Sequence, residues 1–203
     1  MKIYLLLAAL FLFFLTVVAR VFWQKYFFNP FSKTQKRAQA GNAQAQYQLG
    51  RFYYEGKFIP KDFNLAFAWF SKAATNNYIP AKIALAALYN AGEGCEKNPR
   101  KTFCLYQESA QSGNFEARIN LAFCYLHGIG TETNAQAAFE ILKKAADEKS
   151  PLAQTLTGDL YERGLGTTQN NKEAMRYYVL AAKQGEPIAK QKITALSHKL
   201  AHK

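Results

Sequence analysis

Residues 113–148 read GNFEARINLAFCYLHGIGTETNAQAAFEILKKAADE, and this 36-residue pattern decides the fold because the chain repeats it. Three residue types recur at the same interval: alanine at Ala45, Ala81, Ala117, Ala153 and Ala189, tyrosine at Tyr53, Tyr89, Tyr125 and Tyr161, and glycine at Gly56, Gly92, Gly128 and Gly164. Self-similarity of this length indicates a solenoid, in which each unit buries its apolar face only when neighbouring copies stack against it. We therefore expect function on an extended surface rather than in a single pocket.

Each unit is predicted to contain two helices. The units are Gly41–Asn76, Asn77–Ser112, Gly113–Glu148 and Lys149–Gln184, with half a copy from Gly185 onward. The apolar stripe of the first helix is clearest as Ala117, Leu121, Cys124 and Tyr125, and that of the second helix as Ala66, Trp69, Phe70, Ala73 and Ala74. Such helical spacing predicts amphipathic helices. Gly50 and Gly158 should lie where two helices cross closely, with large core residues such as Tyr178 beside them.

A glycine turn is expected between the two helices of each unit. Paired glycines occur at Gly92-Glu93-Gly94, Gly128-Ile129-Gly130 and Gly164-Leu165-Gly166. Glycine suits a helix end that turns through positive φ, so the first helix should end at the first glycine of each pair. Short polar residues, able to accept hydrogen bonds from the unpaired amides of a new helix, follow at Asp62, Asn98, Asn134 and Asn170.

Together these features resemble the Sel-one-like repeat family (SLR), a relative of the tetratricopeptide repeats. Over residues 40–200 the resemblance rests on the leading alanines, the turn glycines, the caps, and the motifs Leu49-Gly50 with Tyr53, Trp69-Phe70 and Ala73-Ala74. Two sites depart from the pattern: Phe58 occupies the place of the second turn glycine, and Lys149-Ser150 replace a glycine turn. The resemblance implies an all-α fold, an α-solenoid of four 36-residue helix-turn-helix repeats plus a C-terminal capping helix.

An apolar stretch precedes the repeats and is expected to form an N-terminal hydrophobic membrane helix. Ile3–Ala19 has no charged residue, and continuing past Arg20 to Phe28 gives a length that can span a bilayer. Lys2 and the small residue Ala19 also fit a cleavable signal peptide. We favour an uncleaved anchor, because the aromatic and basic residues that follow resemble an interfacial belt. The expected domains are 1–28, a transmembrane anchor or signal segment; 29–39, a basic linker; and 40–203, the repeat solenoid.

Positive charge is concentrated outside the repeats. The first 40 residues hold six cations and no acid, residues 41–182 hold 15 cations and 13 acids, and residues 183–203 add a net +4. A solenoid that binds nucleic acid would spread cations along its binding face, so we expect no nucleic acid partner. A basic cluster beside an anchor instead suits anionic headgroups. We expect a single-pass protein of the cell membrane. The positive-inside rule favours a cytoplasmic repeat domain, whereas the resemblance implies a periplasmic one, and both stay open.

No residues form a recognisable catalytic or metal site. The histidines are His127, His198 and His202, and the cysteines are Cys95, Cys104 and Cys124. Neither set has the converging ligands of a metal site or the adjacent base of a nucleophile, and the glycine turns lack the features of a phosphate loop. Cys124 is expected in the core and Cys104 at the surface. We expect a protein that is not an enzyme and has no cofactor, metal or small-molecule substrate.

The first helices are predicted to carry a partner-binding groove, because they line the concave face of the related tetratricopeptide solenoids. Projecting that geometry onto this chain selects Tyr47, Arg51, Tyr54, Ile83, Asn90, Ile119, Phe123, Asp159 and Glu162. Such a set suits an extended segment or helix of another protein. We expect a membrane-anchored adaptor for protein–protein interaction. The alternative, implied by the resemblance, is a bacterial immunity protein that neutralises a secreted antibacterial effector.

Overall fold

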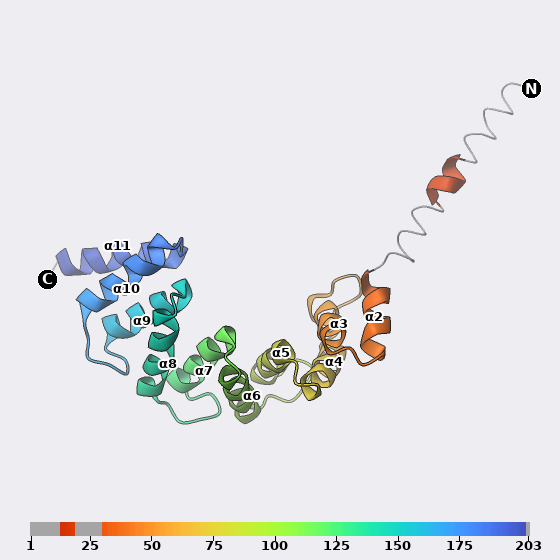
Figure 1. The fold of residues 1–203 in the computed structure, drawn as a ribbon, viewed down its shortest axis with the longest axis horizontal. Helices are drawn as coiled ribbons and strands as arrows, with labels where there is room; N and C mark the ends of the chain where they lie inside the picture. The colour runs from red at the N-terminus through yellow and green to blue at the C-terminus, as the bar shows by residue number, and fades with distance from the viewer. Residues whose placement is uncertain (1–12, 19–29, 202–203) are drawn as a thin grey trace, which may run out of the picture. The chain divides into compact units, whose positions relative to one another are not determined.

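The computed structural model describes residues 13–18 and 30–201, and within these residues every regular element is a helix (Figure 1). The helices are α2 (Pro30–Gln39), α3 (Ala43–Glu55), α4 (Phe63–Thr75), α5 (Ile79–Ala91), α6 (Pro99–Gln111), α7 (Phe115–His127), α8 (Ala135–Asp147), α9 (Pro151–Arg163), α10 (Asn171–Lys183) and α11 (Pro187–Ala201). The predicted all-α repeat fold is confirmed. Most of the predicted membrane segment, residues 1–12 and 19–28, lies outside the described residues. Among the described helices, none is both long and apolar enough to cross a bilayer.

The chain divides into two compact units, Met1–Ala81 and Lys82–Lys203, called unit 1 and unit 2 below. In unit 1, α2 packs against α3 and α3 against α4. In unit 2, each helix from α6 to α11 packs on the next one along the chain. Consecutive helices therefore supply each other with an apolar face, as the repeat requires.

Of the stretch 29–39 that was expected as a basic linker, residues 30–39 form α2. Ala38 is buried, and the ring of Phe31 lies 6.3 Å from that of Phe52 and 6.1 Å from that of Tyr53, centroid to centroid. These few apolar contacts fix the helix against α3. The helix was not predicted because basic residues dominate this stretch, and its apolar stripe is as short as Phe31 and Ala38.

The predicted helix caps are confirmed in every repeat. The first helix of three repeats ends at a left-handed glycine, Gly56, Gly128 or Gly164, with φ between 67° and 70°. Each second helix begins after a side chain whose oxygen accepts hydrogen bonds from the first-turn amides: Asp62, Asn98, Asn134 and Asn170. These caps satisfy donors that a helix start leaves unpaired.

The second turn glycines have a packing role that the sequence did not reveal. A Cβ on Gly130 would lie 2.0 Å from the carbonyl oxygen of Pro99, and a Cβ on Gly166 would lie 2.0 Å from that of Ala135. Each turn thus rests against the start of the preceding repeat's second helix. Phe58, at the same place in the first repeat, keeps the left-handed conformation with φ of 71°, although a non-glycine residue there costs about 1–2 kcal/mol.

Candidate partner-binding surface

The outward faces of the first helices are the candidate surface, and in unit 2 they form regular stripes. Side chains at i, i+4, i+7 and i+11 are exposed or only partly buried, although Leu156 among them also packs against the core. On α7 the stripe is Glu116, Asn120, Phe123 and His127, and on α9 it is Leu152, Leu156, Asp159 and Arg163. Both helices pack on α8. Successive repeats therefore present comparable stripes.

The predicted groove residues of unit 2 divide into exposed and buried positions. Ile83 and Ile119 are each 6% exposed, so they pack inside the array and offer almost no area to a partner. Asn90 is exposed, and Phe123 keeps 37% of its surface exposed. The predicted stripe was thus displaced by one residue at some positions, and it missed Asn120, next to Ile119. The spacing of the least apolar residues in the repeat could have identified the face that stays exposed.

Phe123 is the most exposed aromatic side chain among the described first helices of unit 2. Its ring stacks on the imidazole of His127, with centroids 6.1 Å apart and planes 6° apart. An aromatic ring held flat by a neighbour one turn away is a rigid apolar anchor, the kind of residue that dominates protein interfaces.

The predicted residues of unit 1 take part in contacts within that unit. Tyr47 is half-buried between Phe70 and Tyr78, with ring centroids 5.6 and 5.4 Å away. Arg51 forms an exposed ion pair with Glu55, one turn further along α3. Tyr54 is exposed, and its ring lies 5.5 Å from that of Phe63. Of the three, Tyr47 has the least surface to offer a partner.

Asp159 and Glu162 hold the C-terminal helix instead of standing free at the end of a groove. Lys192 Nζ lies 2.6 Å from Asp159 Oδ1, and Lys199 Nζ lies 3.0 Å from Glu162 Oε1. The hydroxyl of Tyr178 lies 2.6 and 3.0 Å from oxygens of these two carboxylates, which share its single proton. Burial, together with these carboxylates, raises the pKa of Tyr178 far above its ordinary value, so the hydroxyl stays a donor. Lys192 and Lys199 thus help to fasten α11 to α9.

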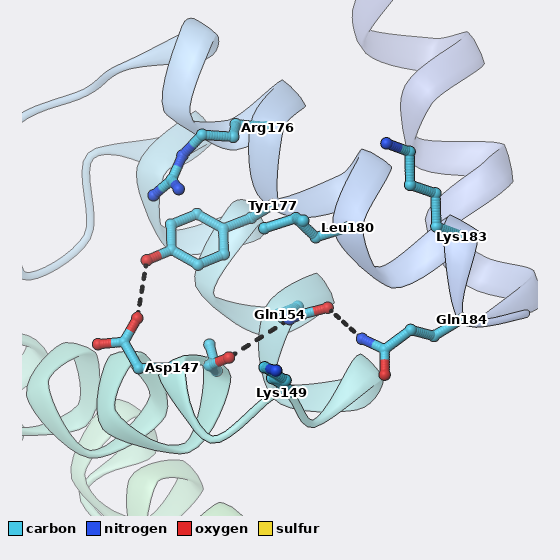
Figure 2. Close-up of a pocket in the computed structure, with 9 residues that line it drawn as sticks. Asp147, Lys149, Gln154, Arg176, Tyr177, Leu180, Lys183 and Gln184 are labelled. Atoms are coloured by element: carbon cyan, nitrogen blue, oxygen red, sulfur yellow. Dashed lines mark hydrogen bonds between the residues drawn. The ribbon is translucent and has the colours of Figure 1, made fainter.

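A shallow pocket of about 390 Å³ lies between the α8–α9 turn and α10 (Figure 2). The hydroxyl of Tyr177 donates to Asp147 Oδ1 at 3.5 Å on one side, and Gln184 Nε2 donates to Gln154 Oε1 at 2.8 Å on the other. Leu180 lies between these two bonds in the view. The lining comes mainly from a second helix and a turn between repeats. The pocket is therefore separate from the first-helix stripes.

The hydrogen bond between Gln154 and Gln184 at this pocket belongs to a type of side-chain contact that recurs along the chain, called the joint below. A residue in the first helix meets a residue just after the second helix, 30 positions later, in the pairs Gln46–Asn76, Arg118–Glu148 and Gln154–Gln184. The bidentate contact from the Arg118 guanidinium holds the pKa of Glu148 below its ordinary value. Because the joint closes three of the four helical hairpins, we assign these side chains to the fold.

Residues with metal-binding or nucleophilic potential stay apart in the described part of the chain. No cluster of three or more histidine, cysteine or acidic side chains could hold a metal ion among residues 13–18 and 30–201. His127 packs on Phe123, and His198 is exposed on α11. His202 lies outside the described residues.

The three cysteines are free and should differ sharply in reactivity. Cys104 is exposed, whereas Cys124 is 1% exposed and burial raises the pKa of its thiol to about 11. Because the thiolate is the reactive species, an alkylating reagent at mildly alkaline pH should label Cys104 first and Cys124 only after unfolding. Mass spectrometry of the labelled peptides measures this order. Equal labelling of both in the native protein would place Cys124 outside the core.

The comparisons with known proteins agree with the repeat geometry. Residues 43–78, 79–114, 115–150 and 151–186 each match the Sel1 repeat. A protective antigen of uropathogenic Escherichia coli that displays an SLR fold is 30% identical, over 79% of this chain and 34% of its own, with a TM-score of 0.74. A Sel1 repeat protein from Oxalobacter formigenes is 27% identical, over 80% of this chain and 65% of its own, also with a TM-score of 0.74.

This chain therefore spans 34% of the first structure and 65% of the second. A search of curated protein sequences gave no match. The matched residues cover four consecutive repeats with the period seen in the sequence, so the resemblance inferred from the turn glycines, caps and alanines is confirmed. The chain belongs to the Sel1 repeat family.

Proposed function

We propose that this Sel1 repeat protein is a membrane-anchored, non-catalytic adaptor that binds a segment of another protein on the outward faces of its first helices. The main support for this proposal is the stripe on α7, where Phe123 is 37% exposed and stacks on His127. Polar neighbours flank this ring, with Glu116 and Asn120 in the preceding turns of the same helix. An apolar anchor with a polar rim is the usual composition of a protein interface.

The stripe on α9 extends this surface in the next repeat. Leu152 is exposed near the start of the helix, and Arg163 is exposed at its end. Asp159 lies between them and is already engaged by Lys192. A partner segment would thus meet an apolar contact and a cation here. We infer a partner helix or extended segment with apolar side chains and at least one acidic group.

Phe123→Ala should weaken partner binding about 5- to 30-fold while leaving helicity and melting unchanged, because truncating an exposed anchor typically costs about 1–2 kcal/mol of binding. Leu180→Ala is the matched control, since Leu180 is similarly exposed but lies on a second helix. A photo-crosslinker placed at either position in cells identifies the partner. Titration of the purified partner then measures both variants. Equal crosslinking at both positions, or equal affinity of both variants, would rule out the α7 stripe.

The identity of the crosslinked partner also tests the adaptor role. A resident protein of an envelope, secretion or signalling assembly supports it. A secreted antibacterial effector, against which the chain protects producing cells, would replace it with the immunity role. Resistance of the full chain to alkaline carbonate extraction tests the membrane anchor. A reporter fused after residue 203 distinguishes a cytoplasmic from a periplasmic repeat domain.

A further inference from the structure

The loop between α3 and α4 displays an aromatic side chain that the repeat fold does not need. Phe58 is 49% exposed and has a φ of 71°. Glycine stands at this place in the other repeats, at Gly94, Gly130 and Gly166. The ring of Phe58 meets only the edge of the Phe52 ring among the described aromatic contacts, at 5.1 Å and 88°. A strained backbone thus carries a large apolar group into solvent.

One lysine lies over this exposed ring, and a second lies over two other aromatic rings near the same loop. Lys57 Nζ lies 5.4 Å from the centre of the Phe58 ring. Lys61 Nζ lies 5.2 Å from the ring of Phe63 and 6.0 Å from that of Tyr54, which is itself 39% exposed. We call Tyr54, Lys57, Phe58 and Lys61 the basic-aromatic loop. Its mixture of interfacial aromatics and cations is typical of surfaces that lie on anionic membranes.

The loop lies at the end of unit 1 where the apolar N-terminal stretch joins the repeats. Phe31, the second residue of α2, comes three residues after Phe28 in the sequence. Its ring contacts the ring of Phe52 at 6.3 Å, and Phe52 in turn contacts Phe58 at 5.1 Å. A single ring therefore separates Phe58 from the start of α2. A membrane segment that ends near residue 28 would bring the loop to the bilayer surface.

The charge of unit 1 fits such a surface. Residues 1–81 carry ten cations and two acids, whereas residues 82–203 carry sixteen cations and twelve acids. Both acids of unit 1 are occupied, since Glu55 pairs with Arg51 and Asp62 accepts from the backbone amide of Leu65. Glu55 and Asp62 are therefore the two acids that oppose the ten cations of unit 1, which keeps a net positive charge.

We propose that the basic-aromatic loop is a second membrane contact, which inserts Phe58 into the interface of an anionic bilayer and places Lys57 and Lys61 against lipid phosphates. The inference rests on the proposed membrane anchor and adds that unit 1 has a fixed orientation on the bilayer. Aromatic rings favour the headgroup region, and anionic lipid attracts lysines within a short screening distance. The strained conformation of Phe58 then serves to present its ring.

The test uses the full chain in vesicles and a tryptophan as depth probe. With Trp23 and Trp69 replaced by Phe, the variants Phe58→Trp and Phe123→Trp place one tryptophan either in the loop or on the exposed α7 stripe. Lipids brominated on their acyl chains quench tryptophan that enters the bilayer. In vesicles of phosphatidylcholine and phosphatidylglycerol, the probe at position 58 should lose most of its emission and the probe at position 123 almost none. Phosphatidylcholine alone should give weaker quenching at position 58.

A charge-reversal pair tests the lysines. Lys57→Glu with Lys61→Glu should reduce quenching at position 58 to the level seen without phosphatidylglycerol. Lys97→Glu with Lys144→Glu, the same charge change at exposed lysines of unit 2, should leave it unchanged. If the chain fails to float with vesicles, the membrane anchor itself is wrong. If it floats but position 58 is unquenched, or both probes are quenched equally, the loop contact is wrong and the anchor stands.

Discussion

Gly166→Ala should lower the free energy of unfolding by about 3 kcal/mol or more, the combined effect of a left-handed alanine and an overpacked contact. Gly166 has a φ of 69°, a conformation that a Cβ disfavours. That Cβ would also lie 2.0 Å from the carbonyl oxygen and 2.4 Å from the carbonyl carbon of Ala135. Both atoms belong to the backbone of α8, so a change of side-chain rotamer cannot relieve the clash. The turn must move away from α8, which separates two successive repeats.

Gly185→Ala separates the two contributions. Gly185 also has a positive φ, 88°, but a Cβ there would meet nothing within 4 Å. This control should therefore lose only the conformational part, about 1–2 kcal/mol. Equilibrium denaturation of the full chain in mild detergent, followed by circular dichroism, compares the two variants. Equal decreases in the free energy of unfolding for the two variants would show that the turn at Gly166 does not pack against the preceding repeat.

Local features of the fold could be predicted from the sequence because each depends on neighbouring residues. The cap at Asn134 and the left-handed end at Gly128 follow from residue types within one turn of the chain. Cys124 was placed in the core, and Cys104 at the surface, from their alignment between repeats. The 36-residue period made these inferences strong, since each was supported by several copies.

Features that depend on distant parts of the chain could not be predicted in the same way. The contact of Gly166 with the Ala135 carbonyl joins two repeats, so the sequence showed only that both turn positions favour glycine. The pairing of Lys192 with Asp159 required knowing how α11 lies on α9. The candidate surface was displaced for a simpler reason. One residue turns a helix by about 100°, so Ile119 was taken for an outward position although Asn120 occupies it.

Tyr178→Ala is expected to lower the free energy of unfolding by about 3–5 kcal/mol, the usual cost of emptying a buried aromatic site. Tyr178 is 0% exposed and packs with Ala174 and Leu196, so it joins α10 to the C-terminal helix. Its hydroxyl also holds the carboxylates of Asp159 and Glu162. Tyr178→Phe removes only these hydrogen bonds and should cost about 2 kcal/mol, as for bonds to charged acceptors.

A second substitution tests whether this ring is what requires a glycine at position 158. In the native protein a Cβ on Gly158 would lie 2.6 Å from Cε1 of Tyr178, so Gly158→Ala should destabilise by about 1–3 kcal/mol through overpacking. With Tyr178→Ala already present the ring is gone, and only the carbonyl oxygen of Ala174, 3.2 Å from that Cβ, stays close. Alanine then favours the helix over glycine by about 1 kcal/mol, so the effect of Gly158→Ala should vanish or change sign.

Thermal melting and denaturant titration of the four proteins in this cycle give the coupling between the two sites. The two free-energy losses are expected to be far from additive, because the Tyr178 ring occupies the space that a methyl group at position 158 would need. Additive losses would mean that helix α9 can shift away from α10 to admit a methyl group. The fold would then tolerate a wider crossing of the two helices at position 158, and glycine would not be required there.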